Sequence, residues 1–307
     1  MLGFIGRRIA WNALVLVGVA FIVHALLLAT SDPARALLPP TTPPEVIESF
    51  RRAHGFDQPL PVQFALFLPR ALTGDFGDSI RYGEPALGVV LERVPATLLL
   101  GAVGLVLALL VAIPLGIAAA MRPGSWADGA ARGVVVVGSG VPNFVVAQAL
   151  ILVVAVGLRL LPVSGSGSAA HLVLPGLVVG LTSAAGFVRI LRTSLLEVFG
   201  NDYIRTAYAK GLSQRAVVVR HALRNAAIPF VTFVAFDLAS ILSGVVIVER
   251  VFAYPGMGLL ATQAVTNRDL PLIQAFVFVS ALAIVTANLV LDLAYAVIDP
   301  RVAVGSR

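Results

Sequence analysis

Long apolar stretches recur along the chain and are separated by shorter polar connections. The apolar runs cover residues 9–30, 96–121, 133–158, 172–197, 228–248 and 272–298. Each run is continuous, and none shows the strict alternation of a barrel strand, so each predicts a helix. A helix of about 20 apolar residues spans the ~30 Å hydrocarbon core of a bilayer. The pattern therefore predicts an all-α polytopic membrane protein with six transmembrane helices.

The first apolar run follows Arg7 and Arg8, an arrangement that also occurs in secretory signals. The run is longer than the about 7–15 apolar residues of a signal-peptide core, and no clean small-x-small cleavage site follows it. We therefore expect an uncleaved anchor helix. The predicted organisation is an anchor over residues 1–30, an extracytoplasmic loop over 31–94, a core of helices over 95–298 and a cytoplasmic tail over 299–307.

The composition agrees with a membrane protein and indicates its orientation. Apolar residues make up 58% of the chain and charged residues 12%, with a mean hydropathy of +0.94, whereas soluble domains carry charge on about a quarter of their residues. The net charge of +6 needs no nucleic acid, because Lys and Arg are enriched in cytoplasmic loops. This bias places both termini in the cytoplasm. The cytoplasmic side then carries Arg7, Arg8, Arg122, Arg132, Arg189, Arg192, Arg205, Lys210, Arg215, Arg220, Arg224, Arg301 and Arg307.

Sequence motifs of the common catalytic and metal sites are missing. The chain has no cysteine, and it contains neither G-x-x-x-x-G-K-[ST] nor H-E-x-x-H, so we expect it not to bind ATP by itself. Its four histidines are scattered without the spacing of a metal site. The Ser-Gly-Ser-Gly-Ser stretch at 164–168 is not G-x-S-x-G. We expect no catalytic residue, no metal site and no cofactor in this chain.

Proline and glycine interrupt several of the predicted spans. These residues are Pro114, Pro142, Pro175, Gly138, Gly140, Gly176 and Gly180. Kinks and close helix packing explain them, with Gly176-x-x-x-Gly180 as a small-residue contact face. Broken helices that line a transport path are the alternative. The local sequence favours packing.

A basic stretch at 202–229 stands out in this apolar chain. Asp202 is a good N-cap for a short helix over 203–210, Gly211 is a good C-cap, and Ser213 is suited to cap a second helix that runs toward Pro229. Thr206, Ala207 and Gly211 give the first helix a small-residue side. A solvated loop that only fixes topology is one interpretation. A capped helix with a smooth face favours the other, docking against a protein.

The basic stretch resembles a known family. Its residues read R-T-A-x-A-K-G-L-S at 205–213 and R-H-A-L-R-N-A-x-x-P at 220–229. They are similar to the cytoplasmic "EAA" loop of ABC importer permeases, in the form of the B-type permease of dipeptide and oligopeptide systems. Further matching stretches run in order along nearly the whole chain: 59–63, 74–79, 93–97, 244–249, 252–258 and 292–301.

The resemblance implies a type I ABC importer permease fold in a bacterial cell membrane. The cytoplasmic coupling loop would extend over 198–227, and its coupling helix would fit a groove on a cytoplasmic ATPase. Arg205 stands in place of the motif's Glu, Thr206 and Ala207 in place of its two alanines, and Gly211 in place of its glycine. The implied partners are a homologous C-type permease, two P-loop ATPase subunits that bind ATP–Mg, and an extracytoplasmic substrate-binding protein. The coupling residues are Arg205, Thr206, Ala207, Lys210, Gly211 and Leu212.

The resemblance also implies that outer segments face the binding protein. The residues expected there are Asp75, Glu249, Pro255, Gly256 and Gly258. Nickel-chelate and glutathione importers have very similar permeases and are alternatives to a peptide system. A stand-alone proton-coupled transporter is a different class, but it leaves the capped helix unexplained.

Polar residues within the spans are candidates for a translocation path. The candidates are Asp237, Ser240, Asn143 and Gln148. Asp237 lies about nine residues into the fifth apolar run, where an ionised Asp costs about 2.5–3.5 kcal/mol on insertion scales. It either faces a cavity, where it is suited to attract the amino group of a peptide, or bonds to a neighbouring helix. Asp292, in the sixth run, is expected to make a structural contact between helices.

Overall fold

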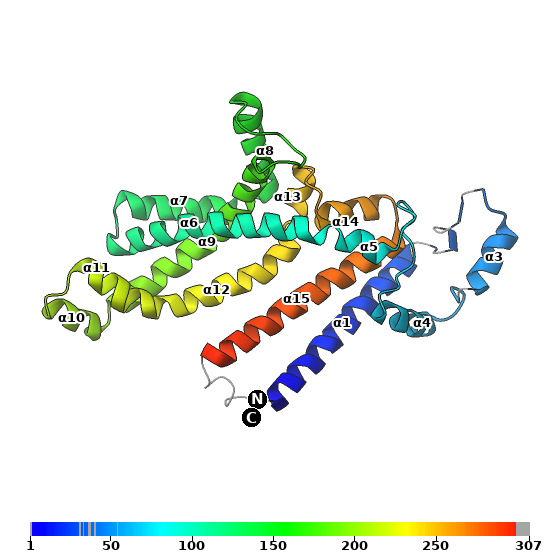
Figure 1. The fold of residues 1–307 in the computed structure, drawn as a ribbon, viewed down its shortest axis with the longest axis horizontal. Helices are drawn as coiled ribbons and strands as arrows, with labels where there is room; N and C mark the ends of the chain where they lie inside the picture. Colours follow the sequence, from blue (N-terminus) through cyan, green and yellow to red (C-terminus); the bar gives the residue numbers. More distant parts are fainter. Residues whose placement is uncertain are drawn as a thin grey trace. The chain divides into compact units, whose positions relative to one another are not determined.

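A computed structural model describes residues 2–30, 32, 34–35, 38–39, 41–53 and 55–298. Within helices, the side chains of residues 2–5, 9, 30, 238–244 and 290–298 are not described. The regular structure in the described ranges is helical, apart from one isolated bridge between Asp78 and Pro85 (Figure 1). The expected all-α fold is confirmed. The chain divides into two compact units, Met1–Thr97 with Pro255–Arg307, and Leu98–Tyr254.

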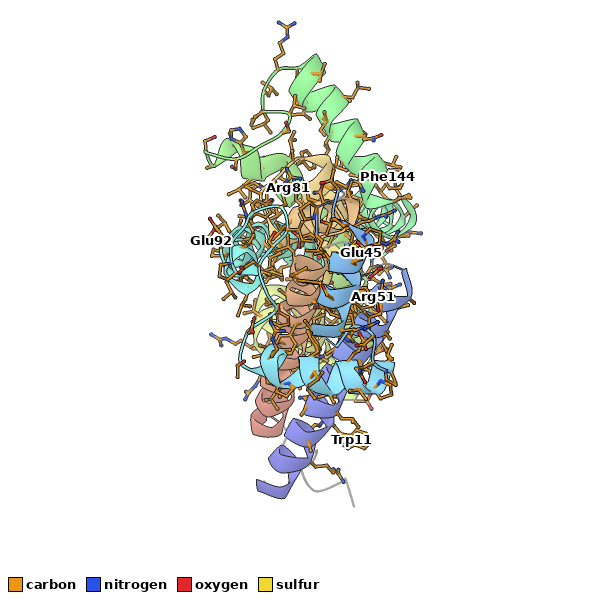
Figure 2. All side chains as sticks on the ribbon, turned by 90° about the vertical axis from the view of Figure 1, so that its right-hand side faces the viewer. Trp11, Glu45, Arg51, Arg81, Glu92 and Phe144 are labelled. Atoms are coloured by element: carbon orange, nitrogen blue, oxygen red, sulfur yellow. The ribbon has the colours of Figure 1, made fainter. Side chains whose placement is uncertain are left out.

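Helices from both ends of the chain form the first unit. Its helices are α1 (Leu2–Thr30), α3 (Pro44–Ala53), α4 (Leu60–Leu72), α5 (Ala86–Leu91), the start of α6 (Val94–Met121), α14 (Met257–Thr266) and α15 (Leu270–Ile298). α15 packs along α1 and against α5 and α14. Trp11 projects outward from α1 and is 60% exposed (Figure 2), as a side chain that faces lipid would be. The segment expected as an outer loop thus includes α3, α4 and α5.

A buried carboxylate ties the outer segment to the start of α15. Asp269 is fully buried and accepts hydrogen bonds from the Ser79 hydroxyl and from the backbone N–H of Arg81, at 3.2 Å. Its other oxygen accepts from the N–H of Leu272 at 3.2 Å, as an N-cap residue does. The stretch at 74–79 is therefore anchored to the last long helix. Phe76 also packs in the apolar core of this unit.

The second unit holds the remaining helices. They are most of α6, then α7 (Trp126–Gly140), α8 (Asn143–Leu150), the π-helix η1 (Ile151–Gly157), α9 (Ala170–Phe199), α10 (Asp202–Ala209), α11 (Gln214–Ala216), the π-helix η2 (Val217–Ala222), α12 (Leu223–Gly244) and α13 (Val246–Val251). α9 is the central helix, and α7 and α12 both pack against it. Its core includes Phe187, Leu191 and Leu195.

Five helices in the described ranges are long and apolar enough to cross a membrane. They are Gly6–Ala29, Ala86–Met121, Ala170–Phe199, Gln214–Asp237 and Leu270–Leu289, and the pair Trp126–Gly140 with Asn143–Gly157 makes a sixth if it counts as one span. This agrees with the predicted six spans. The prediction of one continuous third helix over 133–158 is wrong, because α7 and α8 meet at an angle of 110°. Val141 is extended (φ −99°, ψ 126°), the conformation that Pro142 favours in its predecessor.

Glycines at the contact between α6 and α9 let the two backbones approach closely. A Cβ on Gly180 would lie 2.9 Å from the carbonyl oxygen of Gly104, and one on Gly176 would lie 2.7 Å from Cγ1 of Val103. The predicted packing role of Gly176-x-x-x-Gly180 is confirmed. Both interpretations of the interrupting residues thus hold, at different positions: Gly176 and Gly180 pack, whereas Pro142 breaks a helix.

Candidate functional site

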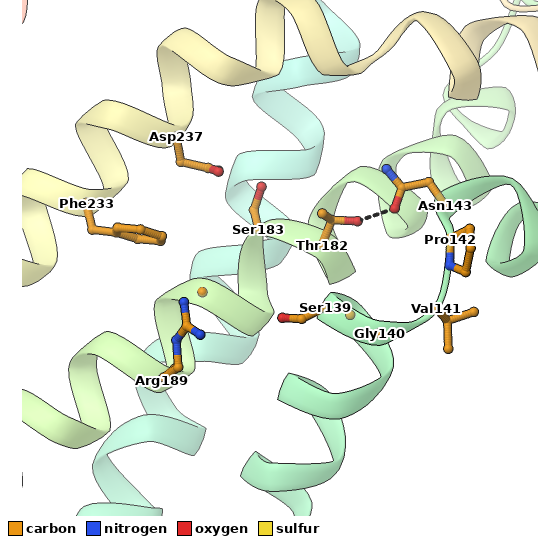
Figure 3. Close-up of a pocket in the computed structure, with 12 residues that line it drawn as sticks. Ser139, Gly140, Val141, Pro142, Asn143, Thr182, Ser183, Arg189, Phe233 and Asp237 are labelled. Carbon is orange, nitrogen blue, oxygen red and sulfur yellow. Dashed lines mark hydrogen bonds between the residues drawn. The ribbon is translucent and has the colours of Figure 1, made fainter.

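A cavity of about 510 Å³ opens in the second unit where α7 gives way to α8. The break at 140–142, α9 and α12 form its walls (Figure 3). Its polar lining residues are Ser139, Asn143, Thr182, Ser183, Arg189 and Asp237. Polar groups are expensive within apolar helices unless they face one another or water. Their gathering at one cavity marks it as the candidate functional site.

A side-chain hydrogen bond lies beside the break in the third span. The Thr182 hydroxyl on α9 donates to Oδ1 of Asn143, the first residue of α8, at 2.7 Å. Gly138 brings the end of α7 against α9, because a Cβ there would lie 2.5 Å from the carbonyl oxygen of Leu181. α7 therefore lies tight against α9 just before the chain turns, and α8 is tethered just after it.

Asp237 is the acidic group of the cavity. It extends from α12 toward Ser183 of α9 (Figure 3), and Ser183 is its hydrogen-bonding neighbour. Its Oδ2 is buried and has no hydrogen-bond partner among the described residues. Features of both alternatives are present, because Asp237 lines the cavity and also hydrogen-bonds to Ser183 of the neighbouring helix α9.

Arg189 is the basic group of the cavity. It lies on α9 and extends into the cavity from the side opposite Asp237 in Figure 3. Within the described ranges, neither residue forms an ion pair, with the other or with any third group. Arg189, which we expected among the charges on the cytoplasmic side, lies within the long apolar helix Ala170–Phe199 and lines the cavity. Two opposite charges thus face one cavity without pairing.

A neighbouring arginine has a structural role that the sequence did not reveal. Arg192 Nε donates to Oδ1 of Asp128 at 2.7 Å, and Arg132 donates to Oδ2 at 2.8 Å. Asp128 is buried near the N-terminus of α7, where the backbone N–H of Gly124 also donates to it at 2.9 Å. The missed signal was Ser125-x-x-Asp128 before an apolar run, a capping pattern. Here Ser125 accepts from the N–H of Asp128 at 3.4 Å.

Of the other predicted path residues, one lines this cavity among the described side chains. Asn143 lines it, but Gln148 is exposed on α8 and does not. Ser240 and Asp292 are among the residues whose side chains the structure does not describe. Sequence reasoning did not select Arg189, Thr182 and Ser183 together. Their spacing along one face of α9, at i, i+1 and i+7, was the available signal.

The basic stretch forms a short helix and a turn. α10 begins at Asp202, and the extended residue before it, Asn201, is the N-cap. The prediction of Asp202 as the cap is wrong by one position. Gly211 ends the turn at φ +78°, a conformation that glycine adopts at little cost. Ser213 caps the next helix, as predicted, by accepting from the N–H of Ala216 at 3.4 Å.

Only part of the expected docking face is available on this loop. Ala207 and Ile204 are buried in the core of the unit, and Leu212 packs against that core. The small-residue side therefore reduces to Thr206 and Gly211, which are exposed together with Arg205 and Lys210. Two aromatic rings that the sequence analysis did not select, Tyr203 and Tyr208, are also 41% and 44% exposed.

Three of the residues expected to face a binding protein are buried. Glu249 is 0% exposed in the second unit, and Gly256 and Gly258 are buried in the first. Their burial lends no support to a direct contact, and their role toward a binding protein stays a prediction. Pro255 is half-buried and Asp75 is exposed. A hydrogen bond from Arg70 Nε, 2.9 Å long, together with one from the Gly77 N–H, lowers the pKa of Asp75 below its ordinary value.

Pro255 and Gly256 line a second, smaller hollow of about 250 Å³ in the first unit. Arg81 and Arg93 contribute its charged groups, and neither forms an ion pair within the described ranges. The Tyr82 hydroxyl forms a 3.3 Å hydrogen bond with Gln263 at its wall. The hollow is therefore basic and fits an acidic group.

The sequence matches two families of known proteins. Residues 112–304 match the family described as binding-protein-dependent transport system inner membrane component, and residues 1–101 match its N-terminal companion. The chain is 37% identical over 308 residues to a probable peptide ABC transporter permease protein of Sinorhizobium fredii, covering 97% of this chain and 98% of that protein.

Two further relatives extend over similar lengths. The oligopeptide transport system permease protein AppB of Bacillus subtilis is 35% identical over 314 residues, covering 98% of this chain and 99% of that protein. The glutathione transport system permease protein GsiC of Escherichia coli is 37% identical over 307 residues, with the same coverage.

Proposed function

Because the chain belongs to the family of binding-protein-dependent transport system inner membrane components, we propose that it is the permease subunit that forms half of the path for dipeptides or oligopeptides in an ATP-driven ABC importer. The observation that carries the proposal is the cavity with polar and charged lining inside a unit of apolar helices. Such a lining satisfies the amides of a peptide in transit. Full-length similarity to two permeases with peptide-transport names supports it.

Permeases of this family are not catalytic themselves, so the energy must come from other subunits. We assign ATP–Mg binding to two cytoplasmic P-loop ATPases and the other half of the path to a homologous C-type permease. The exposed part of the basic loop, with Arg205, Thr206, Lys210 and Gly211, is suited to contact an ATPase. Arg and Lys there complement an acidic rim. Both termini then lie in the cytoplasm.

On the outer side, the basic hollow is suited to an extracytoplasmic substrate-binding protein. Arg81 and Arg93 offer two guanidinium groups in the lining, and the guanidinium carbon of Arg81 lies 5.8 Å from the centre of the Tyr82 ring. A carboxylate of a partner would gain charge-assisted hydrogen bonds there. Pro255 and Gly256, two of the residues expected at this contact, line the hollow.

A glutathione importer is the second candidate, because one of the full-length relatives is a glutathione permease. The test is ATP-driven uptake into liposomes that contain the complete complex, with a labelled dipeptide, a labelled tetrapeptide and labelled glutathione offered in turn. We expect uptake of a peptide that depends on ATP and on the binding protein. Uptake of glutathione without any uptake of the other peptides would replace the peptide assignment by the second candidate.

A further inference from the structure

The charged groups of the 510 Å³ cavity are arranged in levels along two helices. Asp237 and Phe233 are four residues apart on α12, which places them one turn apart on the same face. Ser183, Gly186 and Arg189 follow one another at three-residue intervals on α9. Figure 3 shows Asp237 near Ser183 at one level, Phe233 in the middle and Arg189 at the other end. The cavity is thus acidic at one end, aromatic in its middle and basic at the other end.

The middle level is packed firmly. A Cβ on Gly186 would lie 2.5 Å from Cε1 of Phe233, so the ring lies directly against the backbone of α9. Phe187 also meets the Phe233 ring, edge to face, with the ring centres 6.0 Å apart. The ring therefore has a fixed position between the two charged ends, where it offers an apolar surface.

The separation of the two ends sets the length of a matching ligand. Ser183 and Arg189 are six residues apart, which is about 9 Å along the helix at ~1.5 Å per residue. An extended peptide spans at most ~3.3–3.6 Å per residue, so its two charged ends are about 7 Å apart in a dipeptide and about 10 Å apart in a tripeptide. The cavity volume of about 510 Å³ falls within the ~300–1,000 Å³ typical of small-molecule sites.

We propose that this cavity binds both charged ends of a short, unblocked peptide of two or three residues. Asp237, supported by Ser183, binds the α-ammonium group, Arg189 binds the α-carboxylate, and Phe233 contacts a side chain between them. The buried, unpartnered Oδ2 of Asp237 and the unpaired Arg189 are then satisfied by the two ends of one ligand. The inference rests on the proposed function as a peptide permease and narrows its substrate to short zwitterionic peptides.

The test uses the complete reconstituted complex and three labelled ligands: dialanine, N-acetyl-dialanine and dialanine amide. For each ligand, kcat/KM of ATP-driven uptake is measured, and the ratios of free to blocked dialanine are compared between variants. The binding protein discriminates equally in every sample, so its contribution cancels when a variant is divided by the wild type. Asp237→Asn and Arg189→Gln are the test variants. Glu84→Gln and Arg159→Gln are charge-matched controls at exposed positions outside the cavity.

We expect a crossed pattern. Asp237→Asn lowers the preference for dialanine over N-acetyl-dialanine by about tenfold or more, the factor of one charge-assisted hydrogen bond, and leaves the preference over the amide unchanged. Arg189→Gln lowers the preference for dialanine over dialanine amide and leaves the preference over N-acetyl-dialanine unchanged. The two controls change neither ratio. Co-purification of the partners and basal ATPase activity establish that each variant is assembled.

Other outcomes would overturn the proposal in distinguishable ways. If the wild-type complex transports dialanine but both variants slow all three ligands by the same factor, the two charges pair with protein groups in the assembled complex, and the inference fails while the proposed function stands. A wild-type complex that transports no free peptide at all would overturn the proposed function and the inference with it.

Discussion

The contact between α7 and α9 at Gly138 gives a prediction that the structure makes quantitative. A Cβ at this position would lie 2.5 Å from the carbonyl oxygen of Leu181 and 2.8 Å from Cβ of Ala185, whereas ordinary contacts begin at 3.4 Å. Gly138→Ala must therefore separate the two helices by about 0.9 Å, the difference between 3.4 and 2.5 Å. Overpacking of this kind costs about 1–3 kcal/mol.

Gly133 on the same helix is the matched control. A Cβ there meets nothing within 4 Å, so Gly133→Ala should only gain helix propensity, up to about 1 kcal/mol. Gly138→Ala gains the same helix propensity but is also destabilised by overpacking. The difference between the two variants is therefore expected to be about 1–3 kcal/mol in the free energy of unfolding, with Gly138→Ala the less stable.

Thermal unfolding in detergent, followed by the fluorescence of Trp11 and Trp126, measures this difference. Each kcal/mol corresponds to about 2–4 °C in Tm for a domain of this size, so Gly138→Ala should melt several degrees below Gly133→Ala. Because Ser139 lines the cavity directly after Gly138, uptake by the assembled complex should fall in Gly138→Ala alone. Equal melting temperatures for the two variants would refute the close contact between α7 and α9.

The remaining predictions concern the outer segment, the basic loop, the basic hollow and the orientation. Ser79→Ala removes the hydrogen bond to the buried carboxylate of Asp269 and should cost about 1.5–3 kcal/mol, seen as faster proteolysis of the outer segment; unchanged cleavage would contradict the anchor. Arg205→Glu should leave the complex in the membrane but reduce the uptake achieved per ATP hydrolysed, and an unchanged ratio would exclude a coupling role. Arg81→Glu should weaken stimulation of the ATPase by the binding protein, and wild-type stimulation would remove the hollow from that contact. A protease site inserted within 41–53 should be cut from outside intact cells, whereas protection would reverse the orientation.

The helical class and the number of spans could be predicted from the sequence, because the bilayer restricts which backbone structures can cross it. Every backbone group in the hydrocarbon core must be satisfied within its own segment, so continuous apolar runs become helices. Hydropathy could not show that the chain bends sharply within one of these apolar runs. Prolines also occur in the neighbouring runs, where Pro114 and Pro175 lie inside continuous helices. Pro142 instead lies at a bend of 110° between α7 and α8, next to the Thr182–Asn143 hydrogen bond and the close approach at Gly138.

The candidate site could be predicted only in part. A charged residue in a span either faces a cavity or pairs with another protein group, and the sequence does not distinguish the two. Asp237 was identified from the sequence, since an ionisable residue at that depth is costly. Arg189 was assigned to the cytoplasmic side together with Arg192, because counting charges does not distinguish a residue in a cavity from one in an ion pair with Asp128. Glu249 was expected at an outer surface from the resemblance, which carries no information on burial, and it is fully buried in the structure.

The central claim, that this chain is the permease of an ATP-driven peptide importer, is tested most directly by purification of the tagged chain from its membrane in mild detergent. The recovered proteins are identified by mass spectrometry, and the same preparation is assayed in liposomes for uptake of labelled dialanine with and without ATP. The account predicts a second permease, two P-loop subunits and uptake that requires ATP. A chain that purifies alone and transports under a proton gradient without ATP would contradict it.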